Sequence, residues 1–129
     1  MARILVIEDN LANMQLMVYL LEAFGHEPVE ADTGEQGLEL ARHNTFALIL
    51  CDIQLPRLDG YGVAKELKLH PNLKRTPLVA VTALAMVGDR DKVLGAGFDG
   101  YIPKPIMPET FVSQVEAFLS DHPPGRSGK

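Results

Sequence analysis

Polar side chains with complementary chemistry follow four separate apolar runs of the sequence. Glu8 and Asp9 come after the first run, Asp52 ends another, and Thr82 and Lys104 follow two later ones. Three carboxylates at one place repel one another, and a hard divalent cation such as Mg²⁺, with Mn²⁺ as the alternative ion, relieves that repulsion. A carboxylate can accept a phosphoryl group, and an amine and a hydroxyl can hold its oxygens. Together, these residue types predict phosphoryl-group chemistry.

These side chains can meet only if the elements that carry them end at one place. Unbroken runs of Val, Ile and Leu at 4–7, 47–51 and 77–81 predict strands that are covered on both faces. Weaker candidates at 27–31 and 100–103 each contain a proline, which predicts edge strands.

Helical patterns lie between the predicted strands and give a βαβαβαβαβα order. The predicted helices cover 11–24, 34–44, 60–70, 87–96 and 108–119. The spacing in the first of them turns Met14, Met17, Val18, Leu21 and Phe24 inward. This order predicts a flavodoxin-like, doubly wound α/β fold, a three-layer sandwich with parallel strand order 2-1-3-4-5. In such a sheet the strands' carboxyl ends share one edge, where ligands bind.

The composition restricts the class of protein. The 129 residues suit one domain, expected at 1–121, followed by a flexible tail at 122–129. A net charge of −5 argues against nucleic acid as a direct partner. No apolar run approaches the roughly 18 residues of a membrane span, and one cysteine, Cys51, is compatible with a cytoplasmic location. The four histidines are expected at the surface.

Four segments resemble the receiver domain of two-component response regulators, and the resemblance extends over about residues 3–120. The segments are VIEDN (6–10), LCDIQLPRLDGYG (50–62), VAVTALA (79–85) and GYIPKP (100–105). They look most like single-domain regulators of the DivK type and the receivers of hybrid histidine kinases.

The resemblance implies a role for each acid. Asp52 would accept a phosphoryl group from a sensor histidine kinase or a histidine phosphotransfer protein. Asp9 and Asp52 would bind Mg²⁺ together with the backbone carbonyl of Gln54, and Glu8 would act through water or at longer range. Gln54 would also help to set the lifetime of the phosphorylated state.

The resemblance also implies a switch. Thr82 and Lys104 would contact the phosphoryl oxygens, Tyr101 would turn inward as Thr82 moves, and the Lys104–Pro105 peptide would be cis. A downstream protein would bind the face formed by the helix at 87–96, the strand at 100–103 and the helix from 108. Leu84 would be a second tuning position and Met86 part of the partner surface. The chain would be a monomer or a weak dimer.

Other interpretations compete with this one. A dehalogenase-like phosphatase would carry a second aspartate where Gln54 stands, so we expect a phosphoacceptor switch rather than an enzyme. A flavin carrier would need a hydroxyl-rich loop in place of EDNLAN. Asp9 could merely cap the following helix, and Asp52 could be a cap or turn residue. A degenerate receiver that acts by binding alone, and a receiver excised from a hybrid kinase or multidomain regulator, are further alternatives.

Overall fold

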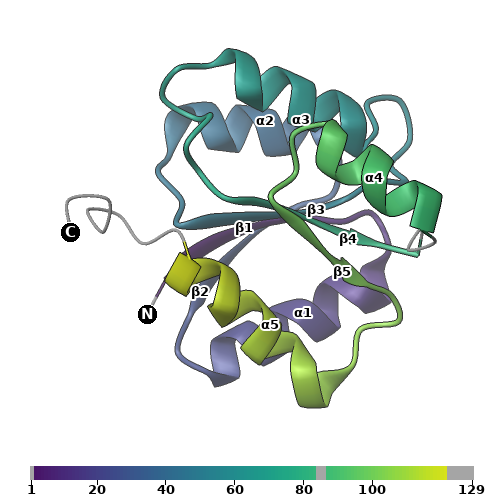
Figure 1. The fold of residues 1–129 in the computed structure, drawn as a ribbon. Coiled ribbons are helices and arrows are strands. Elements are labelled where there is room, and N and C mark those ends of the chain that lie inside the picture. Colours follow the sequence, from purple (N-terminus) through teal and green to yellow (C-terminus); the bar gives the residue numbers. More distant parts are fainter. Residues whose placement is uncertain (1, 84–86, 122–129) are drawn as a thin grey trace.

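The computed structural model describes residues 2–83 and 87–121, which form one parallel sheet covered by helices on both faces (Figure 1). The strand order is β2-β1-β3-β4-β5, which confirms the predicted flavodoxin-like topology. The strands are β1 (Arg3–Ile7), β2 (Glu27–Ala31), β3 (Leu48–Asp52), β4 (Leu78–Thr82) and β5 (Gly100–Pro103). Pro28 and Pro103 lie in β2 and β5, which are the two edge strands. One side of an edge strand has no neighbouring strand, so the N–H that proline lacks is not needed there for a hydrogen bond.

Five helices form the outer layers, with α2, α3 and α4 over one face of the sheet and α1 and α5 over the other (Figure 1). They are α1 (Leu11–Ala23), α2 (Gly34–His43), α3 (Gly60–Leu69), α4 (Val87–Gly95) and α5 (Pro108–Asp121). In the part of the chain that the structure describes, no helix has the length and apolar character needed to cross a membrane.

The central strands β1, β3 and β4 carry unbroken apolar runs because each of their faces meets helices. Along β1, Leu5 and Ile7 belong to the core under α2, α3 and α4, whereas Ile4 and Val6 belong to the core under α1 and α5. All four side chains are at most 1% exposed. Burial on both faces explains the unbroken apolar runs that identify these strands in the sequence.

The first three helices begin at side-chain caps, and these caps fix the loops that follow β1, β2 and β3. Asn10, Thr33 and Asp59 each accept a hydrogen bond from the backbone N–H three residues later, at 2.9, 3.0 and 2.9 Å. Such caps satisfy N–H groups that have no partner within the helix. Since Asn10 caps α1, Asp9 does not, and Asp59 rather than Asp52 caps α3.

Two sequence predictions about the end of α1 are wrong. Phe24 is 61% exposed, because α1 ends at Ala23 and the chain turns away at Gly25, whose φ is +86°. The His26 side chain is only 7% exposed, since its Nδ1 accepts from the Ala2 N–H and its Nε2 lies 2.9 Å from Glu116.

Some predictions lie outside the described residues. They concern Leu84, Met86, His122 and the tail at 122–129. The inward positions of Met14 and Met17 and the buried Cys51 thiol are confirmed.

Candidate functional site

Three acids meet where the neighbouring strands β1 and β3 end. A carboxylate oxygen of each of Glu8, Asp9 and Asp52 lies within 4.8 Å of the others. Glu8 and Asp52 are 1% and 4% exposed, whereas Asp9 faces solvent. The parallel register, which pairs Ile7 with Cys51, brings these strand ends side by side. The site therefore has two buried carboxylates behind one that is open to water.

Lys104 supplies a positive charge to this acidic cluster. Its Nζ lies 2.9 Å from Glu8 Oε1 and 3.1 Å from Asp52 Oδ2, and its side chain is 15% exposed. The contact with Glu8 is an ion pair without the angles of a regular hydrogen bond, whereas the contact with Asp52 is a hydrogen bond. The Lys104 backbone N–H donates to the Thr82 carbonyl at 2.8 Å, which ties the segment after β5 to the end of β4.

The electrostatics of the cluster follow from burial and mutual repulsion. Burial, together with the charge of Asp52, raises the pKa of Glu8 to about 7, against the opposing effects of Lys104 and the Asn10 N–H. Burial alone would lower the pKa of Lys104, but its bonds to Glu8 and Asp52 give a net increase. Lys104 therefore contacts two of the three carboxylates, and one positive charge stands against three acids in the cluster.

This donor set fits a hard divalent cation. Mg²⁺ is usually held by one or two carboxylates together with water or phosphate oxygens, and here three carboxylates converge with one of them open to solvent. The backbone N–H of Gln54 donates to Asp52 Oδ1 at 3.0 Å. Its carbonyl as a further ligand stays a prediction.

The loop after Asp52 packs so closely that one glycine is required. A Cβ atom on Gly60 would lie 2.6 Å from the Asp52 carbonyl oxygen and 2.6 Å from Ile53 Cα, which are backbone atoms that cannot turn aside. The Gly60 N–H donates to the Ile53 carbonyl at 2.9 Å. On the outer side of the loop, Arg57 has φ +61° and pairs with Glu35 at 3.3 Å. The first turn of α3 thus fixes the backbone that carries Asp52.

The predicted switch residues lie beside this cluster on β4 and β5. Thr82 ends β4 with 0% exposure and pairs in register with Pro103. Tyr101 is half-buried and packs against the core under α2, α3 and α4. The Lys104–Pro105 peptide is cis. The structure thus places Thr82 and the Lys104–Pro105 peptide at the carboxyl ends of β4 and β5, with Tyr101 earlier in β5, while their movement stays a prediction.

Sequence reasoning missed two acids near the site. Glu30 and Asp32 join Glu8 and Asp9 around a cavity of about 390 Å³. Asp32 directly follows β2, so the rule that selected the other strand-end residues applies to it as well.

The chain resembles proteins of known family and structure. A sequence profile of the response regulator receiver domain matches residues 4–116. The polar-differentiation response regulators DivK of Brucella ovis and Brucella suis are each 41% identical over 118 residues, which cover 92% of this chain and 96% of theirs.

Solved structures show the same fold. A response regulator from Chloroflexus aurantiacus has a TM-score of 0.87 at 28% identity, covering 92% of this chain and 98% of its own. The receiver domain of a Pseudomonas aeruginosa sensor histidine kinase, described with magnesium in its active-site cleft, has a TM-score of 0.85 at 31% identity and the same coverage.

Proposed function

The chain belongs to the response regulator receiver family of two-component signalling, and from this membership we propose that Asp52 accepts a phosphoryl group from a phosphohistidine. The donor would be a sensor histidine kinase or a histidine phosphotransfer protein. The observation that carries the proposal is the position of Asp52, a buried carboxylate at the end of β3 with Glu8, Asp9 and Lys104 around it. Carboxylates are established nucleophiles toward phosphoryl groups.

The residues of the site have distinct tasks in this reaction. An Asp52 oxygen attacks the phosphorus while the phosphorus–nitrogen bond breaks, and the electron pair goes to the imidazole nitrogen, which takes up a proton. The Gln54 N–H holds one Asp52 oxygen at 3.0 Å and Lys104 holds the other at 3.1 Å, so the carboxylate is oriented beforehand. Lys104 and the Thr82 hydroxyl then contact oxygens of the transferred group.

Glu8, Asp9, Asp52 and the Gln54 carbonyl would hold the metal ion. When bound, Mg²⁺ neutralises charge on the acids and on the phosphoryl oxygens. The acidic cluster supports this choice, and so does the magnesium described in the related Pseudomonas receiver. Nothing comparable supports Mn²⁺, and it is not part of the proposal.

The protein would act as a switch rather than as an enzyme on an external substrate. Gln54 stands where a second aspartate would serve as a general acid, so the chemistry is directed at Asp52 itself. The partner-binding face would be formed by α4, β5 and α5. Two contacts support a transmission route, because Tyr61 of α3 meets both the Phe98 ring, at 6.4 Å between centroids, and Lys92 of α4, at 4.9 Å.

Intact mass after incubation with acetyl phosphate and Mg²⁺ tests the proposal. We expect a gain of one phosphoryl group that disappears in Asp52→Asn. Asp59→Asn is the matched control, since Asp59 is an exposed aspartate of the same loop and asparagine caps helices equally well. It should be phosphorylated like the parent.

A failure with acetyl phosphate alone would be followed by a beryllofluoride titration. This second reagent distinguishes a site that does not react with the small donor from a site that cannot hold a phosphoryl group. If neither reagent modified the parent, the degenerate receiver that acts by binding alone would be the correct interpretation.

A further inference from the structure

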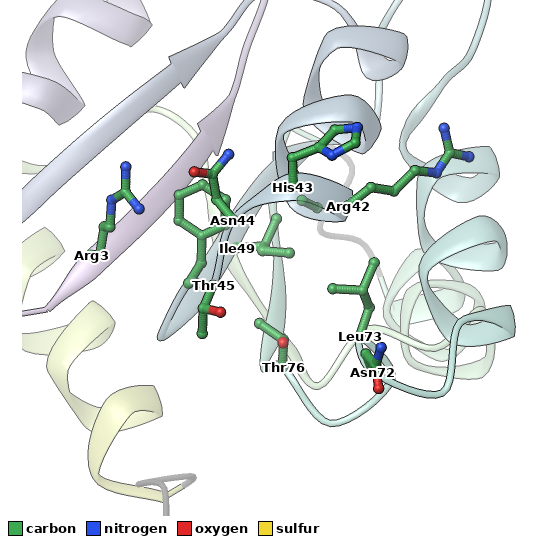
Figure 2. A pocket seen from close by; sticks show the side chains of 11 residues that line it. Arg3, Arg42, His43, Asn44, Thr45, Ile49, Asn72, Leu73 and Thr76 are labelled. Atoms are coloured by element: carbon green, nitrogen blue, oxygen red, sulfur yellow. The ribbon is translucent and has the colours of Figure 1, made fainter.

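A second cavity lies at the edge of the sheet opposite the acidic cluster, where the strands begin. Its volume is about 640 Å³, within the roughly 300–1,000 Å³ that is typical of small-molecule sites. Four segments line it: the start of β1, residues 41–46 at the end of α2, Ile49 in β3, and residues 72, 73 and 76 before β4. In Figure 2, Arg3 and Arg42 lie on opposite sides of this hollow, with Ile49 and Thr76 between them.

The lining is mainly polar, with two arginines at its rim and a small apolar floor. Phe46 and Ile49 are 6% and 1% exposed, so they are fixed in the core, and the half-buried Leu73 adds to the apolar surface. Arg3 and Arg42 stand at the rim. None of the described residues that line this cavity is acidic, although the whole chain has a net charge of −5.

A simpler explanation covers only part of this cationic rim. Helix α2 ends here, and basic residues in a last helical turn complement the partial negative charge of the terminal carbonyls, which accounts for Arg42. It does not account for Arg3, which belongs to a strand and lies over the Phe46 ring with its guanidinium carbon 5.4 Å from the centroid. The stacked guanidinium and ring form a flat, cationic wall.

Both arginines can turn toward a ligand at little cost. Arg3 pairs with Glu27 at 3.5 Å and Arg42 with Glu39 at 3.8 Å, and all four side chains are more than a third exposed. Exposed pairs of this length contribute little to stability. Their guanidinium groups are therefore available for a ligand whose anionic group offers shorter, charge-assisted hydrogen bonds.

We propose that this cavity binds a small organic anion that combines a flat apolar ring with a phosphate-like group. The ring would lie on Leu73 and on the Arg3 guanidinium that covers Phe46, and the anionic group would bridge Arg3 and Arg42. The volume is far greater than one inorganic phosphate requires, which favours a ligand with both parts.

Phenyl phosphate is the probe that tests this site, by its effect on backbone amide NMR shifts of the whole chain without Mg²⁺. Saturable shifts are expected at residues 42–46 and 72–76, with affinity at least tenfold above that for inorganic phosphate. Arg3→Gln and Arg42→Gln should each weaken binding about tenfold, because one charge-assisted hydrogen bond is lost. Arg57→Gln is the matched control, since Arg57 also pairs with a glutamate at the surface but far from the cavity, and it should leave binding unchanged.

Three outcomes would overturn the proposal. One is the absence of saturable shifts up to about 10 mM probe, a range that would detect even weak millimolar binding. Another is equal affinity for phenyl phosphate and inorganic phosphate, because the ring would then have no role. The third is a set of shifts confined to Glu8, Asp52 and Lys104, because the probe would then occupy the acidic cluster.

Discussion

Lys104 and Glu8 form the closest charge contact of the candidate site, with 2.9 Å between Nζ and Oε1. The pair joins the segment after the edge strand β5 to the end of β1, and β4 and β3 lie between these two strands in the sheet. The same amine also reaches Asp52 at 3.1 Å. One cation thus makes it tolerable to bury two carboxylates, and the stability of the metal-free protein depends on it.

Lys104→Met should lower the free energy of unfolding of the metal-free protein by about 1–3 kcal/mol, because the two buried carboxylates lose the amine that contacts both of them. Protonation of Glu8 limits the loss. Urea unfolding in the presence of a chelator measures it. Lys68→Met is the control, since its pair with Asp99 is 3.9 Å long and more exposed. Equal losses for the two variants would show that the Lys104 contacts contribute no more to the free energy of unfolding than the exposed Lys68–Asp99 pair does.

The pH dependence of stability should reveal Glu8. Its folded pKa of about 7 exceeds the unfolded value of 4.5, so the folded state holds a proton that the unfolded state has released. The free energy of unfolding should therefore decrease as the pH rises between these values, by about 3 kcal/mol. The contribution is fully present below the unfolded pKa and lost above the folded one.

Glu8→Gln isolates this effect, because its amide does not titrate while all other groups are kept. Urea unfolding of both proteins without metal, at about pH 5 and about pH 8, gives the difference. Addition of Mg²⁺ at the higher pH should restore stability to the parent more than to the variant. Parallel pH profiles of the two proteins would contradict the raised pKa of Glu8.

Much of this site was predictable from the sequence because parallel strands bring their carboxyl ends to one edge. Strand-end position alone selected Glu8, Asp9, Asp52, Thr82 and Lys104, and all of them lie around the ends of β1, β3, β4 and β5. The same rule applies to Asp32, which directly follows β2. Roles such as phosphoacceptor or switch came from the family resemblance and not from position.

The mistaken predictions concern residues whose surroundings are set by distant parts of the chain. His26 is buried because it meets Glu116, which is 90 positions later in the sequence. No local pattern encodes that contact. Phe24 has the helical spacing of an inner residue, yet the helix ends just before it. Periodicity identifies the inner face of a helix but not the turn at which the helix leaves the core.

Gly60→Ala should damage both stability and phosphorylation, since the new Cβ would lie 2.6 Å from backbone atoms of Asp52 and Ile53. A decrease of about 1–3 kcal/mol in the free energy of unfolding is expected, as for other overpacked sites. Gly95→Ala is the matched control, because nothing lies within 4 Å of its added Cβ, and it should be neutral or slightly stabilising. Normal phosphorylation of a folded Gly60→Ala protein would show that the loop tolerates displacement.

Switching through α4, β5 and α5 should be visible in amide hydrogen exchange when beryllofluoride and Mg²⁺ mimic the phosphorylated state. Exchange within residues 87–103 should change, because Thr82 and Lys104 would shift toward the mimic and both adjoin β5. Exchange in α2 is the internal reference and should stay constant, since α2 lies on the other side of α3 from α4.

Tyr61→Leu, which removes the ring that meets Lys92 and Phe98, should reduce the change in α4 while leaving phosphorylation intact. Identical exchange at 87–103 with and without the mimic, in a protein shown by mass to bind it, would exclude this face as the output of the switch.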